Sequence, residues 1–223
     1  MLEKLFSKRT SMKRNPDRIW RTRDGEFKGL LEFIGTLDRQ TTRILLLAQF
    51  TDTFQDIEKQ LKTKLLNYRA YTTIFEGHLL RTIEEYQSPD CILLARSLAI
   101  PERSPMAGYS NALWNFDIFI FVLEHHPLAS YDDRIIRFAQ SLPSRSRVCF
   151  YESLDGAFFR HHGGMKVSQL VTALGLPDSE YISNPMIDKT IRQSQEKILK
   201  RVVNPIITDT ADQWFQQNYS ADQ

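Results

Sequence analysis

Short apolar runs that alternate with segments of helical periodicity limit the folds open to this chain more than any other feature. The strand-like runs are continuous, which is typical of strands buried on both faces of a sheet. Between them, apolar residues recur every three or four positions, the spacing of helices that cover such a sheet. This order predicts an α/β domain with a parallel sheet of about five or six strands and helices on both faces. The predicted strands are residues 44–50, 71–75, 91–95, 117–123 and 147–151, and the predicted helices are residues 24–37, 51–66, 79–86 and 131–140.

Polar residues indicate where several helices begin. Asp24 is a candidate N-cap for the first helix, and Thr53 with Asp56 has the spacing of a weak capping box. After the last predicted strand the pattern becomes wholly helical. There Asn184 followed by Pro185 has the form of an N-cap with proline in the first turn. The helices predicted in this part are residues 167–174, 185–203 and 208–219.

The pattern divides the chain into three parts: a basic tail over 1–19, the α/β domain over 20–160, and C-terminal helices over 161–223. The tail carries six Lys or Arg residues against two acidic ones. We interpret it as a solvated segment, in preference to an electrostatic contact with an acidic partner or a lipid surface.

Composition and cysteine usage narrow the class of protein. A formal net charge of +2 in 223 residues is too small to argue for nucleic acid by itself. The longest strongly apolar run, residues 44–48, is far shorter than the about 20 residues of a membrane span, so no integral membrane segment is expected. The basic N-terminus has no apolar core like that of a secretory signal. Cys91 and Cys149 lie in predicted strands and are interpreted as inert core thiols, so the sequence indicates a cytoplasmic protein.

Glycine motifs that hold nucleotides do not occur in the sequence. It has no Gly-x-x-x-x-Gly-Lys-Ser/Thr loop, no Gly-x-Gly-x-x-Gly run after a strand and no Gly-x-Ser-x-Gly elbow. The pair Gly163-Gly164 follows no predicted strand, so it lacks the strand-to-helix turn that cradles phosphate. We therefore expect no self-sufficient nucleotide site and no bound cofactor.

Two histidine pairs, His125-His126 and His161-His162, raise the question of a metal site. Adjacent residues of a strand point to opposite faces, and no cysteine stands near either pair at a ligand spacing. We therefore expect no metal. Two acidic pairs are assigned to solvated helix faces rather than to acid–base catalysis: Glu84 with Glu85, and Asp132 with Asp133.

Four segments in order along the chain resemble one known family. Residues 16–22 read Pro-Asp-Arg-Ile-Trp-Arg-Thr, residues 149–159 read Cys-Phe-Tyr-Glu-Ser-Leu-Asp-Gly-Ala-Phe-Phe, and residues 174–177 read Leu-Gly-Leu-Pro. Residues 182–197 begin Ile-Ser-Asn-Pro-Met-Ile-Asp-Lys. Together they resemble the second nucleotide-binding domain of SecA, the preprotein translocase motor. The resemblance implies the RecA-like fold of the C-terminal half of a helicase core.

The chain departs from this family where SecA contacts nucleotide. Residues 95–104 read Ala-Arg-Ser-Leu-Ala-Ile-Pro-Glu-Arg-Ser, without the glycines that let the SecA backbone approach its ligand. The resemblance places Ile136, Phe138 and Ser141 where SecA has arginines that stabilise the transferring phosphate. The half of SecA that carries the phosphate loop has no counterpart among these residues. The resemblance therefore implies a domain without hydrolysis motifs of its own.

Some positions of the SecA pattern are kept. Glu124, His126 and Asp132 match it, and Arg103 and Arg137 lie near vestigial motif positions. These residues leave open a second hypothesis, in which the chain is the trans-acting half of a split ATPase whose partner supplies the phosphate loop. Nucleic-acid binding by a helicase-like module is a third and lower alternative.

The leading hypothesis is a non-catalytic, SecA-like pseudo-ATPase domain. It would act as a scaffold or adaptor among other protein subunits of an export or secretion assembly, cytoplasmic and peripheral to the inner membrane through that complex. The loop over 97–115 is long enough to suggest an interface. The candidate partner-binding residues are Pro101, Met106, Tyr109, Trp114 and Trp214.

Overall fold

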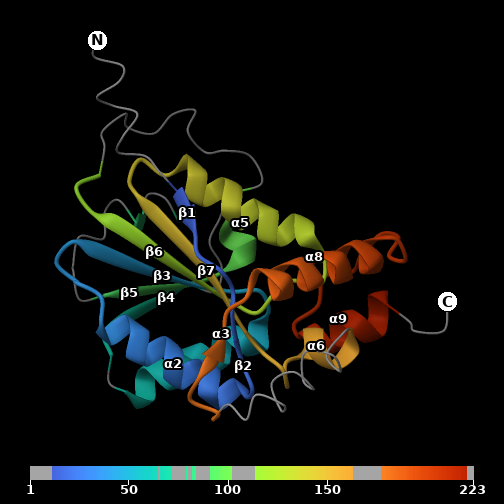
Figure 1. Cartoon of the computed structure of the whole chain (residues 1–223). Helices are drawn as coiled ribbons and strands as arrows, with labels where there is room; N and C mark the ends of the chain where they lie inside the picture. Colours follow the sequence, from blue (N-terminus) through green and yellow to red (C-terminus); the bar gives the residue numbers. More distant parts are fainter. Residues whose placement is uncertain are drawn as a thin grey trace.

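A mostly parallel sheet lies at the centre of the protein (Figure 1). The structure is a computed structural model that describes residues 12–64, 66–71, 79, 82–83, 91–101, 114–162 and 177–219. Within these residues the sheet has eight strands in the order β4-β5-β3-β6-β7-β2-β8, and β1 also pairs with β7. This is the mostly parallel α/β arrangement that the sequence predicts, with eight strands instead of about five or six because the short β1, β2 and β8 join the sheet. Its five long parallel strands are β3 (Thr42–Ala48), β4 (Tyr68–Tyr71), β5 (Ile92–Arg96), β6 (Asp117–Leu123) and β7 (Ser146–Ser153).

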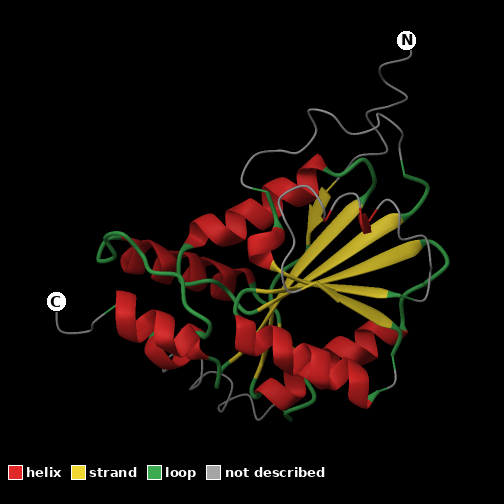
Figure 2. Ribbon diagram, turned by 180° about the vertical axis from the view of Figure 1, so that it is seen from behind, coloured by secondary structure: helices red, strands yellow, loops and turns green. Residues whose placement is uncertain are grey.

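Helices cover both faces of the sheet (Figures 1 and 2). Most residues of β3, β5, β6 and β7 are therefore buried, whereas the edge strand β4 is partly exposed. On one face α5 (Ala129–Ser141) packs through Ile135, Phe138 and neighbouring side chains. On the other face α2 (Arg23–Gly35) and α3 (Thr51–Thr63) form a second apolar cluster. Burial of both faces explains why the strands read as unbroken apolar runs.

The first described residues belong to the sheet rather than to a solvated tail. β1 (Met12–Arg14) and β2 (Arg18–Trp20) both pair in parallel with β7. Trp20 is buried and stacks on Tyr151, with 4.8 Å between ring centroids. The expectation of a solvated segment is therefore wrong for these residues. The sequence gives only a weak signal for β1 and β2, because Ile19 and Trp20 are the buried apolar side chains here and the surrounding residues are mostly basic.

Helix starts differ in detail from the predicted caps. Thr22, rather than Asp24, caps α2, and its hydroxyl oxygen accepts a backbone N–H at 3.1 Å. The predicted capping box of Thr53 with Asp56 does not form, because α3 begins directly after Phe50 without a side-chain cap. β4 begins earlier than residues 71–75, and most of the predicted helices over 79–86 and 167–174 lies outside the described residues.

The C-terminal helices pack onto the α/β body (Figure 2). Asn184 caps α8 (Pro185–Leu199) as predicted, and its side-chain oxygen accepts the N–H of Met186 at 2.9 Å. A third apolar cluster joins α6 (Ala157–His161), α8 and α9 (Ala211–Asn218) to Ile19, Phe50 and Leu128. The short β8 (Tyr181–Ile182) adds an antiparallel strand beside β2.

Cys91 and Cys149 are buried free thiols. Burial raises the pKa of the Cys149 thiol to about 12, which suppresses the reactive thiolate. Among the residues that the structure describes, no helix combines the length and the apolar character needed to cross a membrane.

Candidate functional site

Polar side chains gather at the carboxyl edge of the sheet. Gln49 directly follows β3 and Ser97 directly follows β5. His125 comes two residues after β6, and Glu152 lies near the end of β7. Because strands of a parallel sheet end at the same edge, these side chains come close together in the fold. This edge is where ligands bind in open α/β sheets, so it is the candidate site.

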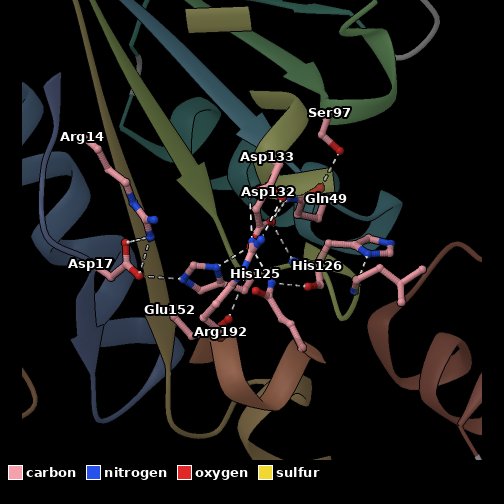
Figure 3. A network of polar contacts seen from close by, with 12 residues as sticks. Arg14, Asp17, Gln49, Ser97, His125, His126, Asp132, Asp133, Glu152 and Arg192 are labelled. Carbon is pink, nitrogen blue, oxygen red and sulfur yellow. Dashed lines mark hydrogen bonds and ion pairs between the residues drawn. The ribbon is translucent and has the colours of Figure 1, made fainter. Parts of the chain in front are cut away.

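A buried histidine at this edge lies between two carboxylates (Figure 3). Nδ1 of His125 is 2.7 Å from Oδ2 of Asp132, and its Nε2 is 3.2 Å from Oδ2 of Asp17. Burial disfavours the charged imidazolium, but the negative charges of Asp132 and Asp17 outweigh that penalty. They raise the pKa of His125 to about 10, so the ring is a cation at neutral pH.

Asp132 connects the histidine to other parts of the fold. Its carboxylate accepts hydrogen bonds from Nε2 of Gln49 at 2.9 Å and from Nε2 of Gln195 at 2.7 Å. Oε1 of Gln49 in turn accepts the hydroxyl of Ser97 at 2.6 Å. The carboxylate of Asp132 therefore joins α5, β3, α8 and the end of β6. We refer to Arg14, Asp17, Gln49, Ser97, His125, Asp132 and Gln195 as the carboxyl-edge network.

The other end of the network is an arginine on β1. Nη2 of Arg14 donates to both carboxylate oxygens of Asp17 at 3.0 Å. Burial raises the pKa of Asp17, but the charges of His125 and Arg14 lower it by more, so the carboxyl stays ionised. A hollow of about 230 Å³ beside the network is bordered by Arg192 and by Asp133, which form an ion pair at 2.9 Å.

The neighbouring histidine has a different role. The ring of His126 stacks on Tyr131, with 3.7 Å between centroids, and on Phe50 at 5.4 Å. Its Nδ1 accepts the backbone N–H of Leu128 at 3.0 Å. Burial lowers the pKa of His126 to about 3, so the ring is neutral. His125 and His126 follow β6 instead of lying in a strand, so the alternation expected for adjacent strand residues does not apply to them. The two rings nevertheless contact different groups, and His126 packs among aromatic rings.

A second buried polar cluster lies next to the network. Arg23 donates to both carboxylate oxygens of Glu26, at 3.1 and 3.0 Å, and to the hydroxyl of Thr53 at 3.0 Å. Glu124 lies close to this group with a φ of 69°, an uncommon value for a non-glycine residue. Burial raises the pKa of Glu124 to about 8, against the opposing charge of Arg23. Burial, with the charge of Glu26, raises the pKa of Glu152 to about 7.

The N-terminus of α3 is occupied by the chain itself. The carbonyl oxygen of Asp209 accepts the N–H groups of Thr51 at 2.8 Å and of Asp52 at 3.3 Å. The carboxylate of Asp209 also accepts the hydroxyl of Thr51 at 2.7 Å, and Arg96 donates to that hydroxyl oxygen. Free N–H groups at a helix N-terminus are a common phosphate-binding position. Here the segment before α9 takes that position.

The residues at the expected arginine positions belong to the packing of α5. Phe138 is buried in the core beneath the helix, and Ile136 packs against the same cluster. Ser141 donates its hydroxyl to the carbonyl oxygen of Phe138 at 2.7 Å. Arg137 is exposed on α5 and lines a surface pocket of about 290 Å³ with Tyr131 and other α5 residues. Arg103 lies outside the described residues.

The structure describes three of the five predicted partner-binding residues: Pro101, Trp114 and Trp214. Pro101 is half-buried, and Met106 and Tyr109 lie outside the described residues. Trp114 packs partly buried against the core and stacks on a neighbouring phenylalanine at 5.3 Å. Trp214 is only 2% exposed and lies in the third apolar cluster. Trp214 is therefore a core residue of the C-terminal helices, since a side chain so deeply buried cannot anchor a partner.

Sequence reasoning missed most of the carboxyl-edge network. The assignment of Asp132 to a solvated helix face is wrong because its side chain is buried, whereas its neighbour Asp133 is partly exposed. Its spacing of three residues from Ile135 and seven from Ala139 places it on the apolar face of α5, a signal that could have identified it. Glu152, within an apolar strand, was a second such signal. Glu84 and Glu85 lie outside the described residues.

Fold and site together define an α/β domain with a mostly parallel sheet, whose carboxyl edge carries a network of side chains that bind one another. No protein-family model matches the chain. Over most of its length the chain is similar in sequence to protein translocase subunit SecA. It is 21% identical to SecA of Caldicellulosiruptor saccharolyticus over 189 residues, which are 84% of this chain and 22% of that protein. It is 24% identical to SecA of Lawsonia intracellularis over 188 residues, which are 83% of this chain and 22% of that protein.

The chain therefore spans about a fifth of the length of the SecA proteins that it matches. Among solved structures, the C-terminal part of the Fun30 ATPase domain aligns with 78% of this chain and 54% of its own. The TM-score of that alignment is 0.42 and the sequence identity is 13%.

Proposed function

We propose that this chain is a SecA-like pseudo-ATPase domain that acts as a scaffold or adaptor subunit in a protein-export or secretion assembly. The similarity to SecA supports a relation to the protein-translocation ATPase. The proposed loss of hydrolysis rests on the carboxyl edge itself. There, His125 and Asp132 satisfy each other as a buried ion pair, and Asp209 occupies the N-terminus of α3.

A nucleotide at this edge would have to displace those contacts. Separating His125 from Asp132 would break a buried ion pair, which costs several kcal/mol. Removing Asp209 would free the α3 N-terminus but would also detach the segment before α9. The side chains of Ile136 and Phe138 offer no positive charge to a phosphate. Each of these features favours a domain that keeps the fold for protein contacts.

Titration calorimetry of the purified full chain with magnesium–ATP tests the first half of the proposal. We expect no heat of binding at micromolar nucleotide, because His125 already pairs with Asp132 and Asp209 already occupies the N-terminus of α3. A saturable micromolar-range isotherm would contradict the pseudo-ATPase assignment. Thermal melts with and without nucleotide provide a second readout, since a bound ligand raises the melting temperature by mass action.

Quantitative affinity purification from the native cell tests the adaptor half. We expect the wild-type chain to recover subunits of the translocation machinery and Trp114→Ala to recover fewer of them. Arg147→Ala is the matched control, because Arg147 is exposed on β7. Equal recovery by all three proteins would remove Trp114 from the proposed interface. Recovery of no transport component by the wild type would contradict the adaptor role.

The exposed position of Arg137 favours a second candidate function. It lines a pocket on α5 beside Tyr131 and Arg134, from which a guanidinium can reach a nucleotide held by another polypeptide. In this candidate the chain completes a split ATPase in trans, with Glu124 and His126 as retained motif positions and Arg103 as a second cation.

ATPase turnover of the purified native assembly distinguishes the two candidates. A split ATPase predicts a loss of roughly a thousandfold in turnover for an essential arginine, in Arg103→Ala or Arg137→Ala. The Arg147→Ala control should leave turnover unchanged. Unchanged turnover in both test variants would exclude the split-ATPase role and leave the scaffold proposal standing.

A further inference from the structure

Four aliphatic side chains stand out into solvent at the C-terminal end of α8 and in the segment that leads to α9. Leu199 is 58% exposed, Val203 85%, Ile206 57% and Ile207 66%. We call residues 199–207 the aliphatic loop. Single exposed apolar residues are common, whereas four within nine residues indicate an interaction site. Figures 1 and 2 place this loop at the far end of α8, at the end of the molecule away from the sheet.

Hydrogen bonds hold the aliphatic loop in this exposed position. The side-chain oxygen of Asn218 accepts the N–H of Ile206 at 2.6 Å, and its Nδ2 donates to the carbonyl oxygen of Ile206 at 3.0 Å. Arg201 donates to the hydroxyl of Tyr219 at 3.2 Å. Asn204 turns the chain with a φ of 55°. The fold therefore ties the loop to α9 while its aliphatic side chains remain outside.

The charges around the loop are positive. Lys197, Lys200 and Arg201 are basic, and no acidic residue occurs between Lys197 and Ile207. The nearest carboxylate after the loop, that of Asp209, is bound to Thr51. The one before it, Glu196, lies 4.0 Å from Arg192. The surface that carries the exposed aliphatic side chains therefore also carries unneutralised positive charge.

We propose that the aliphatic loop inserts into an anionic lipid surface, with its basic residues contacting the headgroups. Aliphatic side chains enter the acyl boundary while lysine and arginine remain among phosphates, and the two contributions together give stable membrane contact. The inference goes beyond the adaptor proposal, because it gives the chain its own contact with the membrane surface.

The size and charge of the surface favour lipid over a second copy of the chain. A stable protein interface takes roughly 20–30 residues from each partner, whereas this loop offers only four exposed aliphatic side chains. A symmetric dimer through the loop would also bring two sets of basic residues against each other. A protruding tip of aliphatic side chains needs a deep groove on a protein partner, but needs no preformed site in a lipid surface.

Vesicle co-sedimentation of the full chain tests the proposal. The vesicles are phosphatidylcholine alone, or phosphatidylcholine and phosphatidylglycerol in equal parts. We expect the wild type to partition into the anionic vesicles about tenfold more strongly than into the neutral ones, and higher salt to weaken that partition. The double variant Val203→Asp with Ile207→Asp should lose about tenfold or more in binding to anionic vesicles.

Met186→Asp is the matched control, because Met186 is 75% exposed at the other end of α8. It should bind like the wild type, and equal melting temperatures would show that all variants fold. Equal binding by wild type and double variant, equal partition into both vesicle types, or no binding at all would each overturn the proposal. Light scattering gives one further contradicting outcome: a wild-type dimer together with a monomeric double variant. In that case a second copy of the chain would cover the loop.

Discussion

Nδ1 of His125 lies 2.7 Å from Oδ2 of Asp132, and both side chains are buried at the carboxyl edge of the sheet. The pair joins the end of β6 to the first turn of α5. Gln49 and Gln195 add β3 and α8 to the same carboxylate. The side chain of Asp132 thus contacts residues from four elements and helps to hold them together at this edge.

Asp132→Asn should destabilise the protein far more than the same change one residue later. The substitution keeps the side chain's size but removes the charge that stabilises the His125 cation, a loss of about 3 kcal/mol for a buried ion pair. Asp133→Asn removes an exposed partner of Arg192 and should cost at most about 1 kcal/mol. Urea denaturation at neutral pH measures both. Equal losses in the two variants would show that the buried pair adds no stability.

Glu124→Gln should make the stability less dependent on pH. The pKa of Glu124 is raised from 4.5 to about 8, so between these values the folded protein holds a proton that the unfolded chain has released. The contribution of Glu124 to the free energy of unfolding is therefore fully present below pH 4.5. It decreases by up to about 1.4 kcal/mol per pH unit and is lost as the pH rises through 8. Glutamine does not titrate, so the slope should become shallower.

Denaturant titrations between pH 5 and pH 8 measure that slope, within the window given by the raised pKa of Glu124. Glu32→Gln is the control, because Glu32 lies exposed on α2 and should leave the slope as in the wild type. A slope in Glu124→Gln equal to that of the wild type would show that Glu124 does not hold its proton in the folded state.

Trp214→Ala should show that the C-terminal helices are part of the folding unit. The indole is 2% exposed and packs edge-to-face against the ring of His126, with 5.6 Å between centroids. Its loss should cost about 3–5 kcal/mol, as for other buried aromatic residues. Trp114→Ala should cost less, because Trp114 is only partly buried. Thermal unfolding compares them, and an unchanged midpoint for Trp214→Ala would contradict this packing.

Two glycines of α2 should respond in opposite directions to alanine. A Cβ at Gly29 would lie 2.6 Å from the indole of Trp20, which is buried against Tyr151, so Gly29→Ala should cost about 1–3 kcal/mol. A Cβ at Gly35 meets nothing within 4 Å, so Gly35→Ala should stabilise by about 0.5 kcal/mol through helix propensity. Denaturant midpoints measure both. Equal effects of the two changes would contradict the close approach of Trp20 to α2.

The long strands and their covering helices could be predicted because local pattern and final burial agree. The most strand-like segment, residues 117–123, forms β6 with those bounds, and Asn184 caps α8 as its sequence indicates. β1 and β2 could not be predicted in this way. Their pairing with β7 depends on residues more than 100 positions away, and their apolar residues are few: Met12, Ile19 and Trp20.

The chain's order of apolar runs by itself determined the α/β class and the sheet's two-sided burial, because continuous apolar strands and amphipathic helices are stable only when packed together. The residue-by-residue match to SecA, also available from sequence alone, placed Ile136, Phe138 and Ser141 at positions where SecA has arginines. Only the tertiary structure decided what fills the carboxyl edge. The charge of His125 depends on Asp17, 108 residues earlier in the chain, and Asp209 reaches α3 across 158 residues. Such contacts leave no periodic trace in a sequence, since they depend on where the fold brings single polar atoms together.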